Sequence, residues 1–88
     1  MKSEVREKMH HMLDLVLDIN ESGKATTFMD FSGHVNIAVV SSYIPKWEPD
    51  YDPDIRDQVN LSRYDDPGYM EVSLDEAIAN LEKVMKGE

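Results

Sequence analysis

The sequence contains no cysteine and no long apolar run, and only 4 of its 88 residues are glycine. Without cysteine no disulfide can join its segments, so its stability must come from one compact hydrophobic core. No apolar stretch approaches the roughly 18 residues that a membrane-spanning helix needs. The first residues are charged rather than signal-like. These features predict a single domain over residues 1–88, in the cytoplasm and without membrane contact.

Basic residues are also scarce, because 9 Lys and Arg stand against 18 Asp and Glu, which gives a formal charge of −9. The excess of acid lies after residue 47, in the C-terminal half of the chain. A field of this sign repels phosphate, so direct binding of nucleic acid is not expected. It suits a basic protein partner, although solubility alone is also a sufficient reason for such a charge.

Two segments have the apolar spacing of amphipathic helices. In residues 3–22 apolar side chains recur every three or four positions, with Ser3 as the expected N-cap and Gly23 as the expected left-handed C-cap. Near the C-terminus, Ser73 and Glu76 have the spacing of a capping box, which predicts the start of a second helix.

The stretch between the helices begins with two β-prone runs that meet at Ser32 and Gly33. They predict a hairpin with a two-residue loop, in which Gly33 supplies the positive φ and Phe31 pairs with His34. One face of this hairpin is expected to pack on the core and carries Thr26, Phe28, Val35, Ile37 and Val39. The other face is expected to stay open and to join copies of the chain into a homo-oligomer through Met29, Phe31, His34, Ala38 and Val40.

Residues 59–64 alternate well enough to predict a third strand. The resulting fold class is α+β, with a three-stranded antiparallel sheet flanked by the N-terminal and C-terminal helices in the order α-β-β-β-α. We expect the two helices side by side on one face of the sheet; the alternative is that they sandwich it.

Residues 44–58 contain three prolines and five acids and predict a loop that is longer than most connections. Aromatic rings next to carboxylates suit contacts with a basic protein. The expected partner-binding residues are Tyr43, Trp47, Glu48, Asp50, Tyr51, Asp52 and Asp54. The alternative is that the aromatic residues fold over the second sheet face and complete the core.

Two sets of residues have the types found in hydrolytic or zinc sites. Asp30, Ser32 and His34 crowd one hairpin, but the predicted register points Asp30 to the core face and His34 to the other, with no nucleophile elbow at Ser32. His10 and Asp14 stand one helical turn apart, yet zinc sites normally need three or four ligands. We therefore expect no catalytic residue and no metal here.

Asp50, Asp52 and Asp54 have the spacing that opens a calcium loop. Such a loop needs Gly at its sixth position and Glu at its twelfth, where this chain has Ile55 and Leu61. A solvated acidic loop is the preferred interpretation, and no cofactor is expected anywhere in the chain.

The segment Phe-x-Asp-Phe-Ser-Gly-His-Val-Asn, from Phe28 to Asn36, follows a predicted helix and precedes Trp47 and a C-terminal Ala-Ile-x-x-Leu helix. In this layout the chain resembles small uncharacterised proteins carried by phages and prophages of Gram-positive bacteria. The resemblance implies a phage or mobile-element setting and no transferable site residues.

Taken together, these patterns predict a self-associating, non-enzymatic protein-interaction module. The alternative is an acidic inhibitor, or nucleic-acid mimic, that occupies the basic groove of a host protein.

Overall fold

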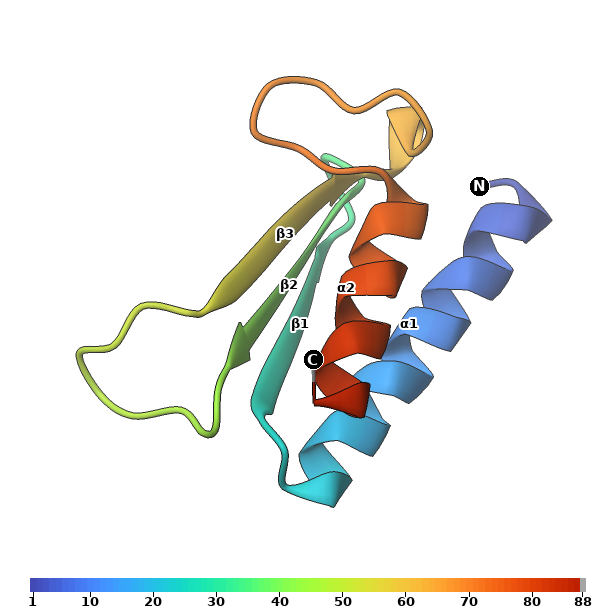
Figure 1. Ribbon diagram of the computed structural model, residues 1–88. Helices are drawn as coiled ribbons and strands as arrows, with labels where there is room; N and C mark the ends of the chain where they lie inside the picture. The colour runs from blue at the N-terminus through green and yellow to red at the C-terminus, as the bar shows by residue number, and fades with distance from the viewer. Residues whose placement is uncertain (88) are drawn as a thin grey trace.

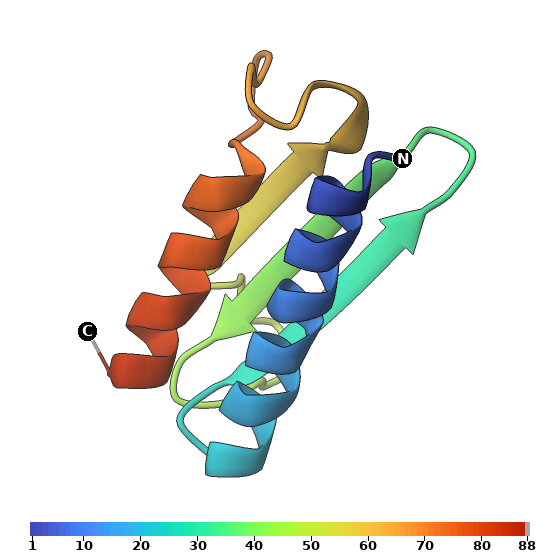
Figure 2. The ribbon, with the colours of Figure 1, turned by 90° about the vertical axis from the view of Figure 1, so that its right-hand side faces the viewer.

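The computed structural model describes residues 1–87 and has the predicted α+β fold with the order α-β-β-β-α (Figure 1). The three strands form one antiparallel sheet in the order β1-β2-β3. Both helices lie side by side on the same face of this sheet, as expected (Figures 1 and 2). The elements are α1 (Ser3–Ser22), β1 (Thr26–Ser32), β2 (Ile37–Tyr43), β3 (Ile55–Asn60), the 3-10 turn η1 (Leu61–Arg63) and α2 (Leu74–Lys86).

Helix α1 ends as its sequence predicts, because Gly23 adopts the left-handed conformation with φ 75°. Its start differs from the prediction: the N-cap is Lys2, and no side chain caps the first turn. The last turn is tied to the sheet by Asn20, whose carboxamide accepts a hydrogen bond from the Thr27 amide and donates one to the Thr27 carbonyl. This pair of bonds satisfies backbone groups on the outer edge of β1.

The β1–β2 hairpin forms, but the predicted two-residue loop is wrong. Ser32 pairs with Ile37 and Phe31 with Ala38, so Gly33–Asn36 forms a four-residue loop. The positive φ falls at Asn36, at 57°, and not at Gly33. Asparagine tolerates this conformation, and its carbonyl accepts a hydrogen bond from the Leu61 amide at 2.9 Å. A contact from the distant turn η1 therefore helps to hold the loop.

The third strand begins four residues before the predicted one and ends at Asn60. Residues 61–63, which the sequence assigned to the strand, form η1 instead, and the Asn60 side chain caps it by accepting from the Ser62 amide. The preceding loop is thus shortened to residues 44–54. The side of β3 that faces the helices carries Ile55, Asp57 and Val59, and the residues between them face away. The strand therefore has the usual period of two.

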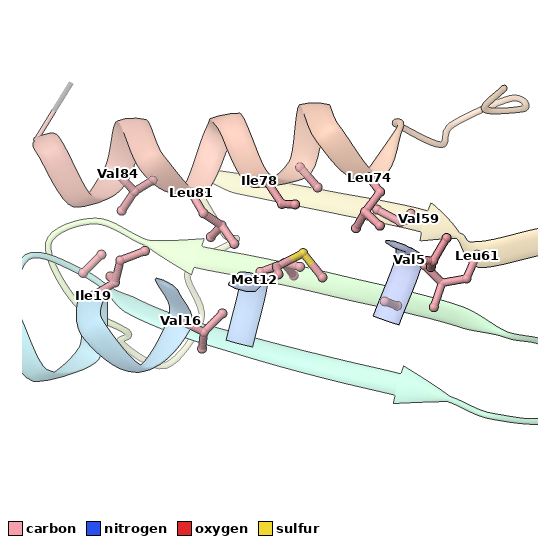
Figure 3. Packing of buried hydrophobic residues seen from close by; sticks show 14 residues of the cluster. Val5, Met12, Val16, Ile19, Val59, Leu61, Leu74, Ile78, Leu81 and Val84 are labelled. Carbon is pink, nitrogen blue, oxygen red and sulfur yellow. The ribbon is translucent and has the colours of Figure 1, made fainter. Parts of the chain in front are cut away.

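The hydrophobic core lies between the helices and one sheet face (Figure 3). This face carries Ala38 and Val40, which are 0% and 3% exposed, and Val59 of the third strand. The expected assignment of the faces is therefore reversed: the helices cover the face predicted to be open. The helices contribute Val5, Met12, Val16, Ile19, Leu74, Ala77, Ile78, Leu81 and Val84 to this core.

Two polar pairs lie within the covered face, and each is satisfied internally. The hydroxyls of Thr27 and Ser42 are 2.9 Å apart on adjacent strands. The Asp57 carboxylate accepts a hydrogen bond from the Asn80 carboxamide of α2 at 2.9 Å. Buried polar groups cost free energy mainly when they have no hydrogen-bond partner, so these two pairs carry no large penalty in folding free energy. They also fix the register of the strands and the position of α2.

The start of α2 confirms the predicted cap, because the Ser73 hydroxyl accepts a hydrogen bond from the Glu76 amide at 3.1 Å. The loop before it is folded around Glu71, which accepts from the Gly68 amide and from Nε of Arg63. The Gly68 bond, assisted by Arg63, holds the pKa of the Glu71 carboxyl below its ordinary value of 4.5, against the opposing effect of burial.

Candidate protein-binding face

The face of the sheet opposite the helices is not covered by any helix or strand of residues 1–87 (Figures 1 and 2). We call it the open face. Its residues follow from the strand register, because side chains alternate along each strand. They are Thr26, Phe28, Asp30 and Ser32 of β1, Ile37, Val39, Ser41 and Tyr43 of β2, and Arg56, Gln58 and Asn60 of β3.

The centre of the open face is aliphatic and aromatic. Ile37 and Val39 lie on the middle strand and are only partly buried. Phe28 is 46% exposed, and its ring meets that of Tyr43 edge to face at a centroid distance of 5.8 Å. An apolar centre with polar residues around it has the composition of a protein-binding surface.

Only two charged side chains stand on the open face, and their signs are opposite. Asp30 is on β1 and Arg56 is on β3, so the middle strand separates them. Both residues are exposed. The face is therefore electrically balanced, while the chain as a whole has a formal charge of −9.

The loop of residues 44–54 stands beside the lower end of the open face, on the side away from the helices (Figure 1). Asp54 closes it, because its carboxylate accepts from the Ile44 amide at 2.7 Å and its amide donates to the Ser42 carbonyl. The Trp47 amide donates to the Thr26 hydroxyl at 3.0 Å, which holds the loop against β1. One internal hydrogen bond thus closes the loop, and two others anchor it to the sheet.

The predicted partner-binding residues are all in this region, but they differ in what they can contact. Trp47 and Tyr51 are 49% and 65% exposed, and Asp50 and Asp52 are also exposed. The exposed positions of these four residues are consistent with a partner-binding role, and that role stays a prediction. Three members have contacts within the chain: Tyr43 with the Phe28 ring, Glu48 with Lys46 at 3.9 Å, and Asp54 with the Ile44 amide.

The predicted self-association residues do not form one exposed surface. Ala38 and Val40 are buried under the helices, and Met29 is partly buried against the same core. Only Phe31 and His34 are exposed. A surface made of these five residues would require the helices to leave the sheet, so the predicted self-association surface is wrong.

Phe31 borders a shallow cavity of about 220 Å³ between the start of α1 and the end of β1. The cavity is lined by Met1, Arg6, Met9, His10 and Phe31. It is smaller than the cavities of roughly 300 Å³ and more that usually hold small molecules.

The residues considered for chemistry are placed as follows. Asp30 and Ser32 lie on the open face, which corrects the expected position of Asp30, and His34 lies in the hairpin loop. His10 and Asp14 are exposed on α1. Among residues 1–87, no three His, Cys, Asp or Glu side chains are grouped so that they could hold a metal ion.

Sequence reasoning missed the contribution of β3 to the open face, namely Arg56, Gln58 and Asn60. Only part of the signal was present, because Ile55 and Val59 alternate with these polar residues while Asp57 between them is charged. The preceding Pro- and Asp-rich segment masked it.

No family model, curated protein or solved structure matches the chain. Neither helix in the described part of the chain has the length and apolar character to cross a membrane.

Proposed function

We propose that the protein is a non-enzymatic protein-interaction module and that the open face is its binding surface. The observation that supports this most directly is a sheet with both helices on one side and an apolar centre on the other. Covering the exposed part of Phe28 alone would contribute about 2 kcal/mol of binding free energy, at about 25 cal/mol per Å². Val39 and Tyr43 lie beside it and would add to this.

The proposed binding surface is tested by a Val39→Lys variant, which places a charge at the centre of the open face. Because Val39 is partly exposed, the lysine can reach solvent and the fold is expected to persist. The measurement is affinity capture by the tagged protein, together with sedimentation of the protein alone. We expect the variant to lose the contacts that the wild type makes, whether with another protein or with itself. Contacts that survive this substitution would contradict the proposal.

A second candidate function is supported by the loop of residues 44–54. Its exposed Trp47, Asp50, Tyr51 and Asp52 place aromatic and acidic groups together on an anchored loop. We propose as the alternative that this loop binds a basic protein, as an acidic inhibitor or nucleic-acid mimic would. We also propose a phage or mobile-element setting, from the resemblance of residues 28–36, and a cytoplasmic location, and both suit either function.

The two candidates are separated by a loop variant with Asp50→Asn and Asp52→Asn, compared with Val39→Lys. If the loop is the binding site, the loop variant loses the captured protein and the wild-type complex dissociates at moderate salt. If the open face is the site, the loop variant retains its partner and Val39→Lys loses it. Equal capture by wild type and both variants would contradict both candidates.

A further inference from the structure

The apolar side chains of the open face form a narrow stripe along the middle strand rather than a broad patch. The stripe consists of Ile37, Val39, Phe28 and Tyr43. Phe28 belongs to it because the register places its ring beside Ser41, the polar residue of β2 on this face. At about 3.4 Å per residue, the stripe is about 20 Å long from Ile37 to Tyr43.

Polar side chains border the stripe on both outer strands. They are Thr26, Asp30 and Ser32 on β1 and Arg56, Gln58 and Asn60 on β3. The outer strands are about 10 Å apart, which is also the diameter of an α-helix with its side chains. A helix of about 14 residues, or four turns, is about 20 Å long. The stripe therefore has the width and length of the apolar side of one amphipathic helix, and α1 and α2 lie along the other face of the sheet in the same way (Figure 2).

The loop of residues 44–54 makes one end of the stripe acidic. It projects on the same side of the sheet as the open face, at its lower end (Figure 1). It contains four acids and one lysine, and its Asp50 and Asp52 are exposed. The open face itself is balanced, because Asp30 and Arg56 have opposite signs. An occupant of the stripe therefore meets an excess of carboxylates at the loop, and basic side chains complement them.

Resting on the proposed function, we infer that the open face binds a basic amphipathic helix of a partner protein. The helix lies along β2 with its apolar side on the stripe, and its lysine or arginine side chains reach Asp50 and Asp52 at one end. A second copy of the chain does not offer such a helix, because its formal charge is −9 and its two helices already pack on its own sheet.

The test uses synthetic peptides of about 18 residues, which is long enough for a helix to form in water, and titration calorimetry. The first peptide has leucine at i, i+3, i+4 and i+7 and lysine elsewhere. The second has the same composition in an order without this spacing, and the third has glutamate in place of lysine. We expect the first peptide to bind at least tenfold more tightly than the other two.

The apolar part of the contact is tested by Val39→Lys, which is expected to weaken binding of the first peptide at least tenfold. Leu17→Lys is the matched control, because it adds the same charge at a half-exposed leucine of α1. It is expected to change the affinity less than about twofold.

The charged part is tested by the loop variant with Asp50→Asn and Asp52→Asn. It is expected to weaken binding of the first peptide about three- to tenfold at low salt, without abolishing it, and to match the wild type at high salt. Asp14→Asn with Asp18→Asn removes the same charge from exposed positions of α1 and is expected to change the affinity less than about twofold.

Equal binding of the first two peptides would overturn the inference, as would a larger loss from Leu17→Lys than from Val39→Lys. An unchanged affinity of the loop variant at low salt would overturn the basic character of the helix. If no peptide binds while Val39→Lys loses a protein that the wild type captures, the inference fails and the proposed function stands. If Val39→Lys changes neither peptide binding nor capture, both fail.

Discussion

The two faces of the sheet are similar in sequence but opposite in environment. Val39 and Val40 are neighbours on β2, and only Val40 lies under the helices. The covered face contains a charge, Asp57, that is paired with Asn80, whereas the open face contains Phe28 with almost half of its surface exposed. Apolar content therefore does not distinguish a core face from a binding face. What distinguishes them is which face the helices cover.

The largest difference is expected from a carboxylate placed on each face in turn. Val40→Asp would bury a charge beside Asp57, its pairing partner on β3, and should destabilise the fold by more than about 4 kcal/mol, enough to unfold a small domain. Val39→Asp puts the same charge in contact with solvent, opposite the exposed Asp30, and should cost less than about 2 kcal/mol. Urea denaturation measures both. Similar losses for the two variants would show that the open face is also part of the core.

Removal of a large buried side chain should have the next largest effect. Met12 of α1 is fully buried between the helices and the sheet, so Met12→Ala should cost about 2–5 kcal/mol. Leu17 on the same helix is half exposed, and Leu17→Ala is the matched control with an expected cost below about 1 kcal/mol. If thermal denaturation gives equal losses, α1 does not pack on the sheet through the face that contains Met12.

A smaller effect is expected at the polar pair on the covered face. Asn80→Ala removes the donor to the buried Asp57 carboxylate and should cost about 1–3 kcal/mol. Asp57→Asn keeps a hydrogen-bonding group of similar shape and should cost less. A larger loss for Asp57→Asn, measured in urea, would show that the charge itself stabilises the fold through some other contact.

The smallest effect is a change in pH dependence at Glu71. Its pKa is lowered in the folded state by the Gly68 amide and by Arg63, so its contribution to stability is complete above the unfolded value and is lost as the pH falls through the folded one. Glu71→Gln should therefore flatten the fall in stability that begins near pH 4.5. Urea midpoints measured between pH 3 and pH 7 would show it. An unchanged slope would mean that other carboxyls account for the acid sensitivity.

Both helices, the C-terminal end of α1 and the N-terminal end of α2 could be predicted because their signals are local. Gly23 takes the predicted left-handed conformation, and Ser73 caps α2 as its spacing to Glu76 indicates. The order of elements could also be predicted, since periods of 3.6 and 2 differ clearly along the chain.

The hairpin register and the choice of core face could not be predicted, because tertiary contacts decide them. Asn36 is held by the distant Leu61 amide, which favours a four-residue loop over the local Ser32–Gly33 turn signal. The faces are too similar in apolar content for the sequence to tell which one the helices cover. The balance of the Asp30 and Arg56 charges on the open face could not be predicted either, because it requires the start of β3 to be known.

The most direct test of a functional open face is the comparison of Val39 and Val40 by methyl NMR. These neighbouring side chains report on opposite faces of one strand. We predict that the Val39 methyl signals shift and broaden when the protein binds its partner, whether another protein or a second copy, while the Val40 signals stay unchanged. Signals of Val39 that remain fixed while the protein binds a partner would contradict the account.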